Sequence, residues 1–223
     1  MFKPKAVFFD LDGTLVNSVP DLADCIDQML WQLGRQPVGE TQVMAWVGNG
    51  LQRLIERALA HTGTREADAE ELKQARYLFD ACYAQHYARR SHLYPGVLPA
   101  LDYLYHELQL PLACITNKAD AFTQPLLAAL DLSPYFKLTL SGDSLAEKKP
   151  HPLPLEQAAA AFNLSPAQTL MIGDSRSDVL AARAAGCMGV ICTRYGYNHG
   201  RPIADEHPDA LLDSLEALRH WIS

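Results

Sequence analysis

The feature that most constrains this chain is the segment from Ala6 to Thr14, whose sequence is AVFFDLDGT. Its apolar residues end abruptly in Asp10 and Asp12, and Gly13 follows at once. A short, continuous apolar run is typical of a buried parallel strand, and ligands bind beyond the carboxyl ends of such strands. Two unit charges about 4 Å apart repel by about 4 kcal/mol at an effective dielectric near 20. The pattern therefore predicts a cation between the carboxylates or a proton on one of them, and an acidic surface turn is the alternative.

The length and composition are those of an ordinary globular protein. The 223 residues suffice for one large domain or for a core with a smaller companion. The net charge is −7 and the Lys and Arg residues are scattered, which argues against nucleic acid and anionic membranes as partners. No segment approaches membrane-spanning length. The five cysteines are odd in number and form no C-x-x-C pair, so we expect buried thiols in a cytoplasmic protein; they stand at positions 25, 82, 114, 187 and 192.

A helical insert is expected early in the chain. Roughly a hundred residues separate Asp10 from the next buried apolar run at 112–116, whereas a parallel crossover can be made with about a dozen. Apolar residues recur at helical spacing in this interval, which predicts helices over residues 20–33, 41–47, 51–61 and 67–90. We therefore predict an all-helical cap domain over residues 18–92 and a core domain of residues 1–17 and 93–223. The insert follows the carboxylates directly and could close over a ligand, although a peripheral bundle is the alternative.

The rest of the chain alternates between the two kinds of secondary structure. Further strands are expected at 138–140, 169–172, 189–192 and 210–212. Helices are expected at 97–106, 121–130, 153–162, 177–185 and 214–222. This alternation predicts an α/β protein with a Rossmann-like parallel sheet that is covered by helices on both faces.

Three more polar signals follow predicted strands. Thr116 and Asn117 could hold a phosphate oxygen, or they could simply cap a helix. Lys148 and Lys149 precede Pro150, and we favour Lys149 for the site because it adjoins the proline. The segment from Gly173 to Asp178 adds two carboxylates, of which Asp178 could instead cap the next helix. Together these groups could hold a hard, oxygen-preferring cation and a phosphate.

These motifs resemble those of the haloacid-dehalogenase superfamily of phosphohydrolases. The pattern D-x-D-G-T at 10–14 is followed by a strand-end Thr116, by Lys149 before a proline, and by G-D-x-x-x-D at 173–178. The insert is similar to the cap of the superfamily's first cap class. Within the superfamily, WVGNG at 46–50, KKPHP at 148–152 and YGYN at 195–198 resemble the phosphoglycolate phosphatases.

The resemblance implies a role for each matched residue. Asp10 would be the nucleophile that forms an aspartyl-phosphate, and Asp12 would be the general acid and base. The Asp10 side chain, the Asp12 backbone carbonyl and the Asp174 side chain would hold Mg²⁺, with Asp178 behind them. Thr116 and Lys149 would bind the phosphate.

The cap is expected to select the substrate. The turn Gly48-Asn49-Gly50 leads into a predicted helix whose free amides could receive a carboxylate, and Arg53 lies within a turn of it. Asn117 is a further candidate for substrate binding. An ordinary turn between helices would explain the same residues. The loop from Tyr195 to Gly200 could support the site or merely connect elements.

The expected activity is Mg²⁺-dependent hydrolysis of a small phosphoester, with 2-phosphoglycolate giving glycolate and phosphate as the first choice. A β-phosphoglucomutase-like phosphomutase and a phosphatase for another sugar phosphate are the alternatives. A dehalogenase would not need Asp12, and a phosphorylated receiver domain would not need the helical insert. A silent interaction protein would not need the full set of motifs. We expect a monomer or a weak homodimer.

Overall fold

The core of the molecule is a six-stranded, wholly parallel sheet in the order β5-β4-β1-β6-β7-β8. The computed structural model describes residues 1–63 and 65–223. The central strand β1 is paired on both sides, with Phe8 opposite Ala113 of β4 and Met171 of β6. The strands are β1 (Ala6–Phe9), β4 (Leu112–Ile115), β5 (Phe136–Leu140), β6 (Thr169–Gly173), β7 (Gly189–Thr193) and β8 (Ala210–Leu212).

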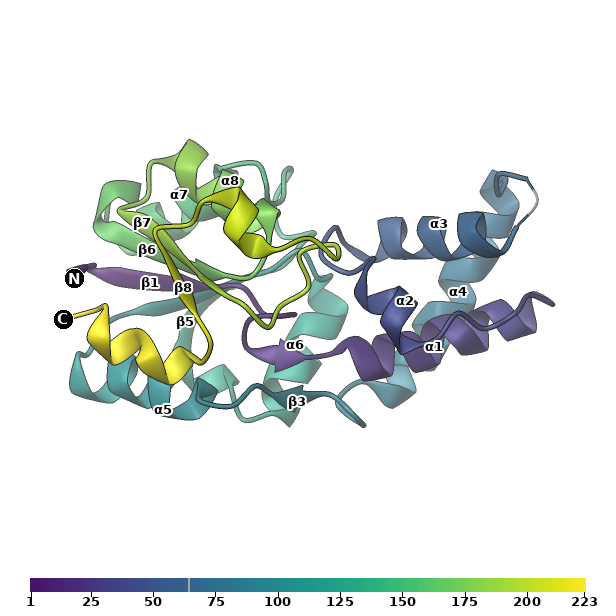
Figure 1. Ribbon diagram of the computed structural model, residues 1–223, viewed down its shortest axis with the longest axis horizontal. Coiled ribbons are helices and arrows are strands. Elements are labelled where there is room, and N and C mark those ends of the chain that lie inside the picture. The colour runs from purple at the N-terminus through teal and green to yellow at the C-terminus, as the bar shows by residue number, and fades with distance from the viewer. Residues whose placement is uncertain (64) are drawn as a thin grey trace.

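Helices cover both faces of this sheet (Figure 1). Alternate residues of β1 point to opposite faces: Val7 and Phe9 pack in one hydrophobic cluster, and Ala6 and Phe8 in another. The first face is covered by α5 (Val97–Asp102), α6 (Asp120–Ala129) and a 3₁₀ segment at Leu215–His220. The second face is covered by α7 (Leu153–Ala161) and α8 (Arg176–Ala185). The predicted Rossmann-like α/β fold is confirmed.

Two predicted helices of the core differ in their form. The helix expected at 97–106 is α5 followed by a π-helical turn at Tyr103–Glu107, where the Leu108 amide donates to the Tyr103 carbonyl. The helix expected at 214–222 is the 3₁₀ segment, and beyond it the C-terminal chain pairs with Phe2 at Ile222. Hydrophobic periodicity predicts which face is buried in both places but does not distinguish these tighter and wider turns from an α-helix.

Four helices form the insert at the carboxyl end of the sheet, on the right of Figure 1. They are α1 (Val19–Gln32), α2 (Glu40–Met44), α3 (Leu51–Thr62) and α4 (Ala69–His86). Their apolar faces make a hydrophobic cluster of their own, in which Ile26, Ile55 and Phe79 are fully buried. The chain enters the insert after β2 (Val16–Asn17) and leaves it at β3 (His92–Leu93), and these two strands pair antiparallel. The division into a cap at 18–92 and a core of 1–17 and 93–223 stays a prediction from the sequence.

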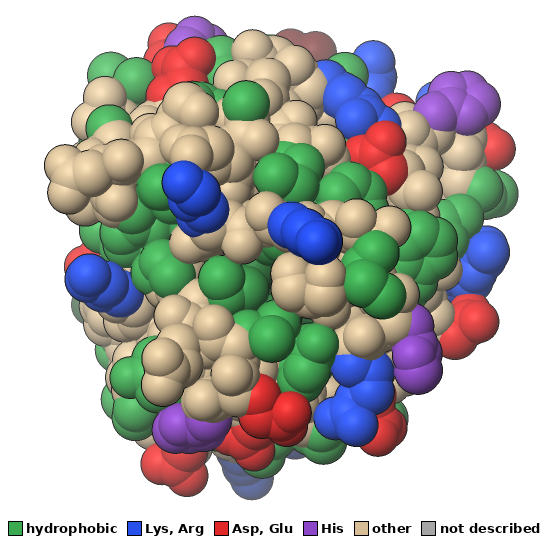
Figure 2. Space-filling view, turned by 90° about the vertical axis from the view of Figure 1, so that its left-hand side faces the viewer, with side chains coloured by type: hydrophobic (Ala, Val, Ile, Leu, Met, Phe, Trp, Pro, Cys, Tyr) green, Lys and Arg blue, Asp and Glu red, His purple; other side chains and the backbone are tan. Residues whose placement is uncertain are grey.

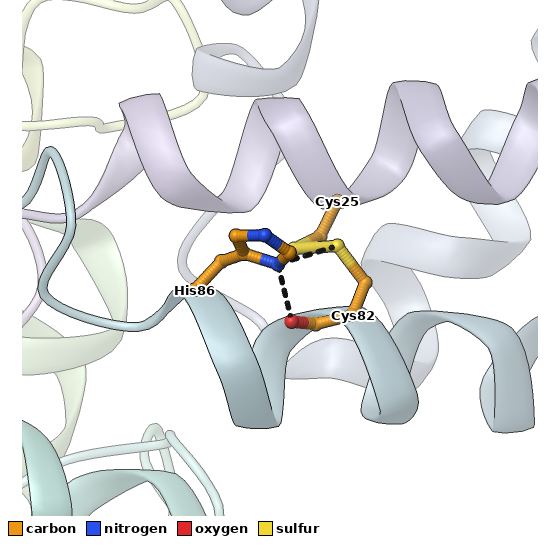
Figure 3. Close-up of side chains that lie close together, drawn as sticks. All are labelled: Cys25, Cys82 and His86. Carbon is orange, nitrogen blue, oxygen red and sulfur yellow. Dashed lines mark hydrogen bonds between the residues drawn. A yellow bond between two sulfur atoms is a disulfide. The ribbon is translucent and has the colours of Figure 1, made fainter.

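The cysteine prediction is wrong at one pair. Cys25 of α1 and Cys82 of α4 form a disulfide, and the His86 imidazole lies beside it with its Nδ1 2.8 Å from the Cys82 carbonyl oxygen (Figure 3). The two Cα atoms are 5.6 Å apart because α1 packs against α4, and that separation suits a disulfide. The two cysteines are 57 residues apart in the sequence, so only the packing of the helices reveals the pair. Cys114 and Cys192 are buried free thiols as predicted, whereas Cys187 is only half-buried.

Charged side chains are dispersed on the end of the core that faces away from the cap. Figure 2 shows Lys and Arg side chains there as isolated groups among hydrophobic and acidic ones. Among the described residues, no helix combines the length and the apolar character needed to cross a membrane.

Candidate active site

The predicted catalytic side chains meet at the carboxyl end of the sheet. Asp10 follows β1, Thr116 follows β4 and Asp174 follows β6, and these three strands are neighbours. Lys149, from the loop before α7, reaches into the same place: its Nζ is 2.9 Å from Asp10 Oδ1 and 2.7 Å from Asp178 Oδ1. The topology therefore brings together residues that are as far apart in sequence as 10 and 178.

The choice between the two lysines is clear in the structure. The Lys149 side chain is 1% exposed and lies between two carboxylates, and its peptide bond to Pro150 is cis. Lys148 is exposed, and its Nζ donates to the backbone carbonyl of Asn49 in the cap at 3.2 Å. Lys149 is thus the lysine that faces the nucleophile candidate.

The buried charges perturb one another strongly. Burial, opposed by Lys149 and supported by Asp178, raises the pKa of Asp10 to about 7. Burial and repulsion by Asp10 and Asp178 raise the pKa of Asp174 well above its usual range. Burial alone would lower the pKa of Lys149, but the neighbouring carboxylates outweigh it and raise that pKa. The site is therefore short of positive charge.

The acidic cluster fits a hard divalent cation. Carboxylate oxygens of Asp10, Asp174 and Asp178 lie within 4.8 Å of one another, and all the donors are oxygens. A cation there would offset both the burial and the repulsion that raise the pKa values of Asp10 and Asp174. The Asp12 side chain is not in the cluster, which leaves its backbone carbonyl as the expected ligand atom. Asp178 also accepts from the Ser175 amide and hydroxyl, so its position is fixed from behind.

Asp174 is held by two residues that lie in quoted motifs but were not among the predicted site residues. The Thr14 hydroxyl donates to Asp174 Oδ1 at 2.8 Å, and the Tyr197 amide donates to Oδ2 at 2.7 Å. A Cβ atom on Gly13, whose φ is +92°, or on Gly196 would collide with this carboxylate. Both glycines stand in motifs that the sequence singles out, and the 195–200 loop is shown to support the site.

Asp12 has two partners that the sequence did not identify. The Ser18 hydroxyl donates to Asp12 Oδ1 at 2.6 Å, and Lys118 Nζ lies 3.2 Å from Oδ2 and 3.3 Å from Oδ1. Ser18 is the residue before α1, at the entry to the cap, and it carries no motif. Lys118 lies two residues after Thr116, a spacing that could have signalled a group at the same sheet edge.

A small cavity of about 50 Å³ lies between this edge and the cap. Asp10, Asp12 and Thr116 form its floor, and the Thr116 hydroxyl accepts from the Lys118 amide, so its own proton is free to donate to a ligand. The walls are largely apolar and come from the cap and the start of α6; they include Leu22, Val47, Leu51, Leu54, Phe79, Tyr83 and Phe122.

The residues predicted to bind the substrate divide into two groups. Gly48 and Asn117 line the cavity, and the Asn117 side-chain amide donates to the carbonyls of Gly48 and Lys149, which joins the cap turn to the core. Asn49 instead accepts from Arg57, away from the cavity. Arg53 is 68% exposed and pairs with Glu56. The structure brings neither Asn49 nor Arg53 to the cavity: Arg53 lies on the charged face of α3, which faces solvent, and Asn49, in the turn before α3, is bound to Arg57.

Comparisons with known proteins agree with this geometry. A model of the haloacid dehalogenase-like hydrolases matches residues 4–186. A protein of Nitrosococcus oceani named phosphoglycolate phosphatase is 48% identical over 99% of this chain and 97% of its own length. Another of that name, from Photorhabdus laumondii, is 46% identical over 96% of this chain and 90% of its own. The crystal structure of a predicted phosphoglycolate phosphatase from Haemophilus somnus has a TM-score of 0.94 and 38% identity, with 99% of both chains covered. The chain therefore belongs to the haloacid dehalogenase-like hydrolase family.

Proposed function

We propose that this protein is a Mg²⁺-dependent phosphomonoesterase that hydrolyses 2-phosphoglycolate to glycolate and phosphate. The observation that carries the proposal is the Asp10 carboxylate, which Lys149 contacts at 2.9 Å at the floor of a small cavity that Asp12 also lines. Relatives that are 46–48% identical to this chain bear the name phosphoglycolate phosphatase, and this supports the choice of substrate.

In the proposed mechanism Asp10 and Asp12 divide the chemistry. An Asp10 oxygen attacks phosphorus and forms an aspartyl-phosphate, while the ester oxygen leaves with a proton from Asp12. Asp12 then removes a proton from water, the water attacks phosphorus, and the Asp10 carboxylate is released with free phosphate. The Ser18 hydrogen bond would keep the Asp12 carboxyl oriented through both steps.

The remaining charged groups would balance the phosphate. Lys149 and the Thr116 hydroxyl would bind its oxygens, and Asn117 would hold the Gly48 turn over them. When bound by Asp10, Asp174 and the Asp12 carbonyl, Mg²⁺ would supply further positive charge to the transferring group. Thr14, Tyr197 and Asp178 would keep the ligands in place from behind. A cytoplasmic location and a monomer or weak homodimer stay predictions from the sequence.

Phosphate release from a panel of small phosphoesters tests the proposal. We expect 2-phosphoglycolate to have the highest kcat/KM, and we expect chelator to abolish release and added Mg²⁺ to restore it. Release from a different ester would change the substrate and keep the mechanism. Analysis of the products tests the phosphomutase alternative, because a mutase returns an isomerised ester where a hydrolase returns free phosphate.

A further inference from the structure

A second buried lysine lies at the cavity and has no part in the proposed chemistry. The Lys118 side chain is 6% exposed, and its Nζ lies 3.2 Å from Asp12 Oδ2. Among the described residues that line the cavity, Lys118 is the one basic side chain, since Lys149 sits beneath the floor. A phosphate bound at Asp10 would have Lys149 and a metal ion as its counter-charges. The positive charge of Lys118 is therefore placed for a different anion.

The cap presents a polar group to the same point. Tyr83 of α4 is fully buried and lines the cavity, and Lys118 Nζ lies 4.9 Å from the centre of its ring. The Tyr83 hydroxyl makes no hydrogen bond of ordinary geometry in the described part of the chain, but it lies close enough to Lys118 to help raise the pKa of that lysine. An unsatisfied buried hydroxyl destabilises the folded protein, and a ligand oxygen that accepts its proton would remove that cost. Phe79 stacks on the Tyr83 ring and Phe122 packs against it at nearly a right angle, so the hydroxyl is held in place.

The contact between Lys118 and Asp12 limits how far the second anion of the substrate can lie from the ester oxygen. Asp12 must reach the ester oxygen of the substrate to protonate it, and Lys118 Nζ touches that same carboxyl group. In 2-phosphoglycolate the carboxylate carbon is two bonds beyond the ester oxygen. A carboxylate so close to the ester oxygen can contact Lys118 while the oxygen contacts Asp12, whereas Arg53 points to solvent.

We propose that Lys118, together with the Tyr83 hydroxyl, binds the carboxylate of the substrate and so determines the specificity of the enzyme. This inference rests on the proposed function and deepens it. One member of the pair comes from the core and the other from the cap, so a carboxylate bound between them would also hold the cap against the core. An ester without a second anion would leave both groups without that partner, and it would be a poorer substrate for that reason.

The test compares two substrates that differ only in the anion, 2-phosphoglycolate and ethyl phosphate. We expect Lys118→Met to lower the ratio of their kcat/KM values by about 10- to 100-fold, the size of a charge-assisted hydrogen bond. Lys118→Arg should retain more of the ratio than Lys118→Met. Tyr83→Phe should lower it by about 3- to 10-fold, because the ring packing is kept and only a neutral donor is lost. Lys118→Met also removes the contact between Lys118 and Asp12, but that loss should lower kcat/KM equally for both substrates and so leaves their ratio unchanged.

Control substitutions of the same two residue types are available on α4, the helix that carries Tyr83. Lys73→Met and Tyr77→Phe change exposed residues of α4 and should leave the ratio unchanged. An equal loss for both substrates in Lys118→Met would overturn the inference and reduce Lys118 to a residue that positions Asp12, while the proposed function would stand. A wild-type enzyme that prefers ethyl phosphate to 2-phosphoglycolate would overturn both. If Lys118→Met does not fold, an unchanged ratio in Tyr83→Phe is the contradicting result.

Discussion

The two sides of the active-site cavity are built in different ways. On the core side, Asp10, Asp174 and Asp178 are packed with Lys149, whose Nζ lies 2.9 Å from Asp10 and 2.7 Å from Asp178. Asp10 and Asp174 follow strands, and Asp178 lies in the first turn of α8. On the cap side, the wall is mostly apolar, and its buried polar side chain, Tyr83, has a hydroxyl that makes no hydrogen bond of ordinary geometry among the described residues. The core side lacks a cation to balance its buried carboxylates, whereas the cap side has a buried hydroxyl that a ligand could satisfy.

This difference shows how the catalytic groups and the groups that determine substrate specificity can occupy different parts of one molecule. The network of the core depends on strands β1, β4 and β6, whose register is fixed by buried residues on both faces. The cap wall depends on helices that meet the core at the β2–β3 ribbon and at the Asn117–Gly48 hydrogen bond. Changes in the network of Asp10, Asp174, Asp178 and Lys149 should therefore affect every substrate. Changes in the cap wall, or in Lys118 beside it, should affect the choice among substrates.

Replacing Lys149 should have the largest effect on the core side. Lys149→Met removes the cation between Asp10 and Asp178, and we expect kcat/KM to fall by about 10²- to 10³-fold for all phosphoesters alike. Two buried carboxylates would also lose their partner, so the free energy of unfolding should fall by about 3–5 kcal/mol. Steady-state kinetics and urea unfolding measure the two effects. Lys148→Met is the matched control, because that side chain is exposed and donates to the Asn49 carbonyl in the cap turn. An equal loss in both variants would contradict the assignment.

The buried carboxylates should make the stability of the metal-free protein depend on pH. The pKa of Asp10 is raised to about 7 in the folded protein, so its protonated form favours folding. The contribution is full below the unfolded pKa of about 4 and is lost as the pH rises through 7. Between pH 4 and 7 the free energy of unfolding of the wild type should therefore fall relative to that of Asp10→Asn, which has no ionisable group at this position. A constant difference measured in chelator would show that Asp10 is not perturbed.

Removing the Ser18 hydroxyl should have an intermediate effect. Ser18→Ala leaves Asp12 paired with Lys118 alone and less well oriented, and we expect kcat to fall by about 5- to 20-fold for every substrate. The ratio between 2-phosphoglycolate and ethyl phosphate should stay the same. A change in that ratio would mean that Ser18 belongs to the selecting side of the cavity.

The smallest effect is expected at Arg53. The structure leaves this side chain in solvent, paired with Glu56, so Arg53→Ala should keep the KM for 2-phosphoglycolate within about twofold of wild type. A large rise in KM for carboxylated esters alone would favour the interpretation from the sequence, in which Arg53 receives the carboxylate. Parallel kinetics with ethyl phosphate separate a specific effect from a general one.

The sequence predicts the core side well because its signals are local. Apolar runs that end in Asp10, Thr116 and Asp174 mark both the strands and the edge where their side chains meet. Parallel topology then brings these residues together without further information. The proline after Lys149 likewise gives a local reason to prefer it to Lys148.

The sequence predicts the cap side poorly because its contacts depend on how helices rotate and pack. Arg53 lies near the glycine turn in sequence, but α3 buries its apolar face, which includes Leu54 and Ile55, and Arg53 is on the opposite, exposed face. Lys118 and Tyr83 are 35 residues apart, and only the placement of the cap on the core makes them neighbours. The disulfide between Cys25 and Cys82 was missed for the same reason.

The most direct test of the account compares wild type and Asp10→Asn in phosphate release from 2-phosphoglycolate with Mg²⁺ present. The variant is nearly isosteric and removes the proposed nucleophile, so we expect turnover to be lost by at least about a thousandfold while the thermal transition is kept. Binding of 2-phosphoglycolate to the variant, measured by calorimetry, should persist because Lys118 and Thr116 are unchanged. Phosphate release at the wild-type rate by a folded Asp10→Asn protein would contradict the account.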